Sequence, residues 1–183
     1  MLFRSVLLLR PRRYGRSAAR AKPGVAQPVH ILVSDAGARV YPAGRLDLNS
    51  EGLLLMTNDG DFAHRVMHPS HNITKTYEVC ARGDIEAAAK ILRRPMEIDS
   101  HTVHAVSVRL AKSKYGRPAL LVEIREGRNR QIRKMCAECG LEVLSLKRIS
   151  VGKLTLGTLK TGKWRRLTEE EVELFWGESG EGQ

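Results

Sequence analysis

An aspartate directly precedes the most apolar stretch of the chain. Asp47 ends the segment Gly44-Arg45-Leu46-Asp47, and residues 52–57 after it predict a strand that is buried on both faces. An acid in a loop beside a buried strand lies at the edge of a sheet, where functional side chains are often found. The alternative interpretation is a turn aspartate whose carboxylate accepts hydrogen bonds from nearby main-chain amides. Residue type and spacing leave both interpretations open.

The basic segment at residues 126–134, with the sequence EGRNRQIRK, is a second candidate. We expect Asn129 to cap a helix over residues 129–139, which places Arg128 and Arg130 at the helix N-terminus. The helix dipole disfavours cations at that end, so guanidinium groups there favour the binding of an anion such as a phosphate. The alternative interpretation is a basic helix face that is only solvated.

A tyrosine on a predicted strand is the third candidate. Tyr77 falls within the β-rich residues 74–81. A tyrosine that faces a pocket can stack on an extruded nucleic-acid base. Most strand tyrosines, in contrast, pack against apolar neighbours and leave the hydroxyl in water.

Cysteine and histidine spacings raise the question of a metal. Cys136 and Cys139 form a C-x-x-C pair, and His64, His68 and His71 follow one another at intervals of four and three residues. Zinc sites use such ligands. The two cysteines fall inside a predicted helix, however, and no second C-x-x-C accompanies them. We therefore expect small buried apolar side chains and no metal site.

The elements that must position these groups follow from apolar periodicity and turn residues. An apolar run at residues 29–33 predicts a short helix or strand. Strands are predicted over residues 52–57, 74–81, 102–110, 118–125, 143–151 and 153–159, and helices over residues 61–67, 84–93, 129–139 and 168–175. The strands at 102–110 and 118–125 are expected to pair antiparallel, and Thr168 with Glu171 predicts a capping box.

Length, charge and cysteine usage limit the class of protein. The 183 residues suit one domain, and no apolar run approaches the roughly 20 residues of a membrane span. The net charge of +11 indicates a polyanionic partner, but seven of the arginines and lysines lie in the first 30 residues, which leaves about +4 for the rest. Three cysteines make no disulfide framework and suit a reducing compartment.

Residues 1–28 differ in composition from the rest of the chain. They contain many arginines and no acidic residue, as in an organellar transit peptide or an RNA-binding arm. A misassigned start of the protein is the interpretation that we prefer. We therefore expect an atypical basic N-terminal segment at residues 1–28, disordered or non-native, followed by one catalytic domain at residues 29–176 and a polar tail at residues 177–183.

Several of these segments together resemble a known family. Residues 44–47 with 50–60, the triplet Lys75-Thr76-Tyr77, and residues 126–135 are similar to three motifs of the pseudouridine synthases that modify ribosomal RNA, in the RsuA/RluB/RluE branch. Residues 146–149 resemble the segment that follows them. The resemblance covers about residues 29–173. The N-terminal segment departs from the family pattern, since only Lys22-Pro23-Gly24 is similar to the usual Lys-Pro-x-Gly.

The resemblance implies a fold and a reaction. The fold is a mixed, largely antiparallel α+β catalytic domain. Many members also carry an N-terminal S4 domain, which we do not expect in these 183 residues. The reaction breaks the uridine N1–C1′ bond of a flipped nucleotide, rotates the uracil and rejoins it through C5. It needs no cofactor. The expected partner is ribosomal RNA, more often that of the large subunit (23S), and the expected setting is a monomer in a bacterial cytoplasm, although residues 1–28 leave an organellar location open.

The resemblance also assigns roles to residues. Asp47 is the catalytic carboxylate, Arg133 pairs with it, and Tyr77 stacks on the uracil. The residues expected to bind RNA are Arg45, Arg128, Arg130, Lys134, Leu146, Lys147 and Arg148. The alternative from another class is a non-catalytic protein that binds the ribosome or RNA through an incomplete synthase fold, which the atypical N-terminus favours.

Overall fold

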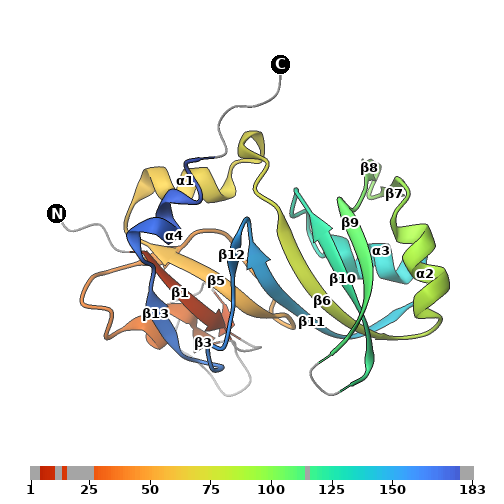
Figure 1. Cartoon of the computed structure of the whole chain (residues 1–183), viewed down its shortest axis with the longest axis horizontal. Helices are drawn as coiled ribbons and strands as arrows, with labels where there is room; N and C mark the ends of the chain where they lie inside the picture. Colours follow the sequence, from red (N-terminus) through yellow and green to blue (C-terminus); the bar gives the residue numbers. More distant parts are fainter. Residues whose placement is uncertain (1–4, 11–13, 16–26, 114–115, 178–183) are drawn as a thin grey trace. The chain divides into compact units, whose positions relative to one another are not determined.

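The computed structural model describes residues 5–10, 14–15, 27–113 and 116–177 (Figure 1). The chain forms two compact units. The first consists of residues 1–73 and 150–183, and the second of residues 74–149. Asp47 therefore belongs to the first unit, whereas Tyr77 and Arg133 belong to the second.

Antiparallel strands form the centre of the first unit. These strands are β1 (Ser5–Arg10), β4 (Tyr41–Pro42), β5 (Glu51–Thr57) and β13 (Trp164–Arg166). β1 lies between β5 and β13, so that Leu7 stands opposite Leu55 on one side and opposite Arg165 on the other. β4 also pairs with β5. The N-terminal strand is thus an inner strand and not an edge.

Side chains of β1 and β5 alternate between two apolar clusters, because successive residues of a strand point to opposite faces. Leu7 and Leu55 contribute to a cluster with Phe62. Val6 and Leu54 contribute to a second cluster. This arrangement confirms the prediction that the strand at residues 52–57 is buried on both faces.

The position of β1 corrects the expectation for the N-terminal segment. Residues 1–28 were expected to be disordered or non-native, but Ser5–Arg10 form a strand in which Val6, Leu7 and Leu8 have no exposed surface. Four consecutive apolar residues are enough for a buried strand. The folded part of the chain therefore begins before residue 29. Residues 1–4, 11–13 and 16–26 lie outside the described part.

Short elements complete the first unit. They are β2 (Tyr14–Gly15) and β3 (Gln27–Pro28), which pair in parallel, the 3-10 helices η1 (Val29–Val33) and η2 (Pro69–His71), the helix α1 (Gly60–Met67), the strand β12 (Leu154–Thr155) and the helix α4 (Glu169–Glu173). Asp59 caps α1 by accepting from the amides of Asp61 and Phe62. β12 is shorter than the strand expected at residues 153–159.

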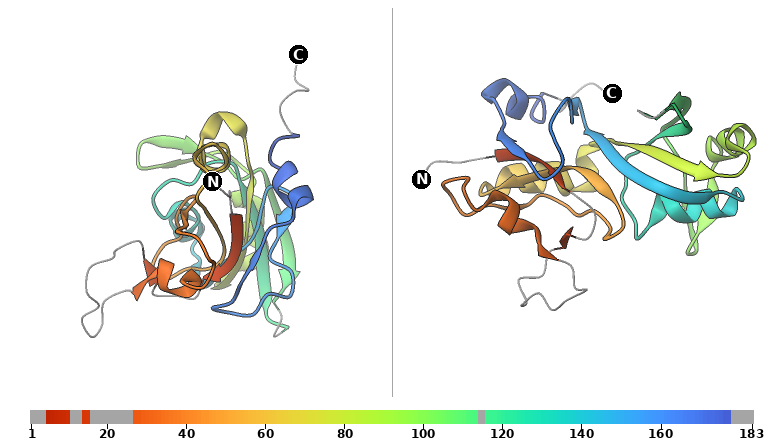
Figure 2. Two further views of the ribbon diagram at one scale, coloured as in Figure 1. Left: turned by 90° about the vertical axis from the view of Figure 1, so that its left-hand side faces the viewer. Right: turned by 90° about the horizontal axis from the view of Figure 1, so that it is seen from below.

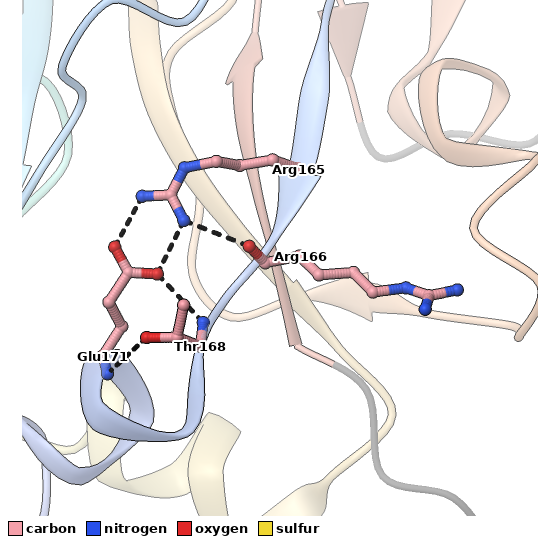
Figure 3. A network of polar contacts seen from close by, with 4 residues as sticks. All are labelled: Arg165, Arg166, Thr168 and Glu171. Carbon is pink, nitrogen blue, oxygen red and sulfur yellow. Dashed lines mark hydrogen bonds and ion pairs between the residues drawn. The ribbon is translucent and has the colours of Figure 1, made fainter.

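A polar network joins α4 to β13 (Figure 3). Arg165 donates two hydrogen bonds of 2.6 Å to the carboxylate of Glu171. Glu171 and Thr168 form the predicted capping box. The hydrogen bonds from Arg165 lower the pKa of Glu171, and the same pair raises the pKa of Arg165. The network thus fixes the start of α4 through a charged side chain as well as through its cap.

The second unit contains the strands in the order β11-β6-β10-β9 (Figures 1 and 2). Its elements are β6 (Lys75–Arg82), α2 (Ile85–Leu92), β7 (Met96–Ile98), β8 (His101–Val103), β9 (Ser107–Lys112), β10 (Pro118–Ile124), α3 (Gln131–Glu138) and β11 (Glu142–Val151), whose last two residues belong to the first unit. β10 is antiparallel to both β6 and β9. The structure confirms the antiparallel pairing that was predicted between the strand ending near residue 110 and the strand at residues 118–125.

The strand expected at residues 102–110 is in fact two strands. His101–Val103 pairs with Met96–Ile98 in a separate hairpin, and β9 begins at Ser107. The hairpin turns at Asp99 and Ser100, which both have positive φ, 51° and 61°. Two-residue hairpin turns require such angles and usually contain glycine, so the sequence gives a weak signal here.

The start of α3 differs from the expectation. Its N-cap is Arg130, with a left-handed φ of 52°, and not Asn129. The Arg130 side chain makes no capping hydrogen bond. The main-chain amide of Arg128 instead donates to the side chain of Gln131 at 3.1 Å. At the other end Gly140, with φ 72°, follows the helix, in the left-handed conformation that often ends helices.

The fold class is α+β with a mixed, largely antiparallel arrangement of strands, as expected. Within the described part of the chain, no helix combines the length and the apolar character that a membrane span requires.

Candidate active site

The loop between β4 and β5 carries Asp47. Gly44 has φ +99°, a conformation that side chains rarely adopt, and it starts the turn toward β5. The amide of Ser50 donates to the carbonyl of Asp47 at 3.0 Å, which closes residues 47–50 into a tight turn. Asp47 itself is partly exposed and Arg45 is exposed. The carboxylate therefore sits on a defined turn with access to solvent.

A buried arginine that the sequence analysis did not single out also contacts this turn. Arg10, the last residue of β1, donates hydrogen bonds to the carbonyl oxygens of Asp47 and Ser50. Arg10 was not a candidate in the sequence analysis because residues 1–28 were expected to be disordered or non-native. An arginine directly after an apolar run is the signal that could have drawn attention to it.

Tyr77 lies on β6 in the second unit, opposite Val122 of β10. Its side chain is 9% exposed, so it packs in the interior of this unit and presents only a small part of its surface. Lys75 lies two residues earlier and therefore on the same face of the strand. Tyr77 and Lys75 thus share one face of β6.

Lys75 is a further titratable group that the sequence analysis passed over as a candidate. Its ammonium donates to the carbonyl of Arg125 at 3.2 Å. Burial, and next the positive charge of Arg148, lower the pKa of Lys75 to about 8. A lysine with this pKa exists in both protonation states near neutral pH. The structure thus brings Lys75 and Arg148 together within the second unit.

β11 presents the three residues expected after the arginine motif. Leu146 and Arg148 are 4% and 5% exposed, whereas Lys147 between them is half-buried. The burial of Leu146 agrees with the apolar role expected of it. A residue that binds phosphate is expected to be exposed, whereas Arg148 is buried. Its side chain therefore offers little surface for a direct phosphate contact.

The basic residues around α3 differ in their contacts. Arg130 is exposed, and Arg133 is half-buried on the helix. Arg128 pairs with Glu126 at 2.9 Å, and Lys134 pairs with Asp99. Ion pairs with such exposure contribute about 0–1 kcal/mol, so an RNA phosphate can replace the carboxylate at little cost.

Cysteines and histidines are engaged in packing and local contacts. Burial raises the pKa of the Cys136 thiol to about 12, as expected of a small apolar side chain in the core. The rings of His64 and His68 stack with centroids 4.8 Å apart, and His71 contacts Arg65 through Nδ1 at 2.7 Å. Among the described residues, no group of three or more His, Cys, Asp or Glu side chains is arranged to hold a metal ion.

Comparison with known proteins identifies the family. A family model described as RNA pseudouridylate synthase matches residues 32–138. A protein of Aquifex aeolicus named as an uncharacterized RNA pseudouridine synthase is 32% identical over 170 residues, which cover 92% of this chain and 68% of that protein. The ribosomal large subunit pseudouridine synthase B of Bacillus subtilis is 42% identical over 137 residues, 73% of this chain and 56% of that protein.

A solved structure agrees with these relatives. A crystal structure of a pseudouridylate synthase matches with a TM-score of 0.79 at 26% identity, over 95% of this chain and 74% of that chain. The chain spans about half to two thirds of the length of the curated relatives that it matches. On the extent of these matches, the chain belongs to the RNA pseudouridylate synthases, a family of isomerases.

Proposed function

We propose that the chain isomerises a specific uridine to pseudouridine in ribosomal RNA, with 23S RNA as the expected substrate. Membership of the family, together with a turn that presents Asp47 to solvent, carries the proposal. The large subunit is favoured because the relative with 42% identity is named a ribosomal large subunit pseudouridine synthase.

The proposed reaction exchanges one bond for another within a single nucleotide. The uridine is first flipped out of its stack, at a cost of a few kcal/mol. The N1–C1′ bond breaks, the uracil rotates, and a C5–C1′ bond forms, after which the C5 proton leaves and N1 is protonated. The atoms of substrate and product are the same, so the reaction requires neither a redox cofactor nor a group donor. Asp47 acts as nucleophile or as base toward the ribose.

The other catalytic residues keep the roles expected from the family. Tyr77 stacks on the uracil and assists proton removal, and Leu146 supplies an apolar wall. Arg133 keeps the role of partner to Asp47 that the family resemblance implies, and this pairing stays a prediction.

RNA binding rests on exposed cations. Arg45 and Arg130 are exposed, Arg128 and Lys134 are held in weak surface pairs, and Lys147 is half-buried. Such residues bind phosphates and contribute affinity with little sequence discrimination. Arg148 is proposed to add to the positive field, since its side chain is buried.

The non-catalytic alternative has lost its main support. It depended on an N-terminus that lacks a strand of the domain, but β1 is present between β5 and β13. The two functions predict different outcomes when unmodified 23S and 16S transcripts are incubated with the protein. Carbodiimide adducts of pseudouridine, mapped as reverse-transcription stops, should appear at one position of the 23S RNA. RNA binding by folded protein without a new stop on either transcript would favour the alternative.

We also propose that the protein acts as a monomer in a bacterial cytoplasm. Light scattering coupled to gel filtration should give a mass near 20.5 kDa. A mass of twice that value would contradict the monomer.

A further inference from the structure

Arg10 is a cation in the interior of the first unit. Its side chain is 2% exposed, and it is one of the largest fully buried side chains among the described residues. Removing a charged group from water is costly unless the group is well hydrogen-bonded. The contacts of Arg10 must therefore account for its position.

These contacts converge on the turn that carries Asp47. A single nitrogen, Nη2, donates to the carbonyl oxygen of Asp47 at 2.6 Å and to the carbonyl oxygen of Ser50 at 2.5 Å. The Asp47 carbonyl also accepts the amide of Ser50, so Arg10 joins the first and last residues of one closed turn. Hydrogen bonds from a charged donor are stronger than those between neutral groups. One of these bonds holds the main chain of Asp47, and the other holds that of Ser50.

Main-chain position decides where a short side chain points. Asp has only two side-chain torsions, so a fixed Asp47 Cα confines its carboxylate to a small region. β1, which carries Arg10, is itself held between β5 and β13 and packs into both apolar clusters. Arg10 therefore connects the turn to an inner strand whose side chains pack in both apolar clusters of the first unit.

We propose that Arg10 is a positioning residue for Asp47, one that acts on the reaction by fixing the turn at residues 47–50. The inference rests on the proposed function of Asp47. A displacement of about 1 Å in a catalytic group can reduce the rate about 10²-fold. Loss of the Arg10 hydrogen bonds should therefore lower kcat and leave KM for RNA nearly unchanged.

Two substitutions of Arg10 separate the effect of its hydrogen bonds from the effect of its side-chain volume. Arg10→Met keeps an apolar stem and removes both hydrogen bonds, so kcat should fall by a factor of about 10–100. Arg10→Lys should retain kcat within roughly threefold, because both bonds come from one nitrogen and an ammonium can donate to two carbonyls.

Arg65 offers a matched control. It is a second buried arginine of the first unit, 6% exposed, and its Nε donates to the carbonyl of Phe175 at 2.5 Å, away from the Asp47 turn. Arg65→Met should lower stability in a similar way, while kcat of the folded protein stays at the parent value.

Amide hydrogen exchange gives a second readout. The amide of Ser50, bonded to the carbonyl that Arg10 also binds, should exchange at least about tenfold faster in Arg10→Met than in the parent. The same amide should keep its protection in Arg65→Met and in Arg10→Lys. If Arg10→Met folds poorly, Arg10→Lys still tests the inference, because a folded Lys variant that loses kcat and the protection of the Ser50 amide would contradict it.

The outcomes distinguish this inference from the function on which it rests. Parent activity with an inactive Asp47→Asn and an impaired Arg10→Met supports both. If Arg10→Met keeps the parent kcat, or if Arg65→Met lowers kcat equally, Arg10 does not position Asp47 and the proposed function still stands. If the parent is inactive, or Asp47→Asn is fully active, both fall.

Discussion

Replacing Leu7 by alanine should destabilise the first unit by about 2–5 kcal/mol. Leu7 is fully buried on β1 and belongs to the cluster that contains Leu55 and Phe62. The substitution removes three carbons, which at about 0.8 kcal/mol each amounts to about 2.4 kcal/mol of lost transfer free energy. The cavity left between the strands and α1 adds to this cost, because a close-packed core relaxes only in part.

Tryptophan fluorescence in urea measures this loss. The chain has two tryptophans, Trp164 and Trp176, and both belong to the first unit. Their emission therefore follows the unfolding of this unit. The midpoint in urea should fall while the slope m stays that of the parent, since the surface exposed on unfolding hardly changes.

Ile31→Ala is the matched control. It also removes three carbons in the first unit, but the Ile31 side chain is 51% exposed. Its effect should stay within about 0.5 kcal/mol. If Leu7→Ala and Ile31→Ala shift the midpoint equally little, β1 does not pack in the core and the N-terminal strand described above is refuted.

Three further predictions concern charge. Arg130→Ala should weaken RNA binding and reduce the slope of log K against log salt by about one unit in a filter-binding titration. As the control, Arg82 is an exposed arginine paired with Glu142, and Arg82→Ala should leave the slope unchanged. Equal slopes for both variants would rule out a phosphate contact at Arg130. Glu171 has a lowered folded pKa, so its stabilisation is present above its ordinary pKa of 4.5 and is lost as the pH falls through the folded value. The urea midpoints of the parent and Glu171→Gln should therefore converge as the pH falls from 4.5 through the lowered pKa of Glu171, and a gap that persists at the most acidic pH would contradict the role of the Arg165 pair. Lys75 has a folded pKa of about 8 against 10.5 unfolded, so its charge costs stability below pH 8 and this cost vanishes as the pH rises to 10.5. Lys75→Met should accordingly raise the midpoint of urea unfolding, followed by circular dichroism, at pH 7 and lose that advantage by pH 10.5; a gain independent of pH would argue against the shifted pKa.

Local signals predicted the central elements of the fold. The apolar run at residues 52–57 leaves a strand no polar face, so burial on both sides follows directly. Thr168 has a side chain that accepts from a helix amide, and it caps a helix in the structure as expected. These features depend on neighbours in sequence, which is why they could be predicted.

Features that depend on distant partners were missed. β1 contains a run of only four apolar residues, with arginines close by on either side in the sequence. This run can be identified as a strand only once its neighbours β5 and β13 are known. The burial of Arg10 follows from carbonyls near residue 50, far along the chain. The pKa of Lys75 likewise depends on burial and on Arg148. No local pattern contains this information.

The candidate site was predicted to the level of residue types. The motifs identified Asp47, Tyr77 and Arg133, and the structure places the first on a turn, the second on β6 and the third on α3. The burial of Arg148 and the exposure of Arg130 could not be predicted, because both residues stand in similarly basic stretches.

Release of tritium from ribosomal RNA labelled at uracil C5 tests the central claim most directly. The C5 hydrogen leaves only when the new glycosidic bond forms at that carbon, so release reports isomerisation and not binding. The parent and Asp61→Asn, a change at an exposed acid of α1, should release tritium at the same rate. Asp47→Asn should bind the RNA and release none. Release by folded Asp47→Asn at the parent rate would contradict the account.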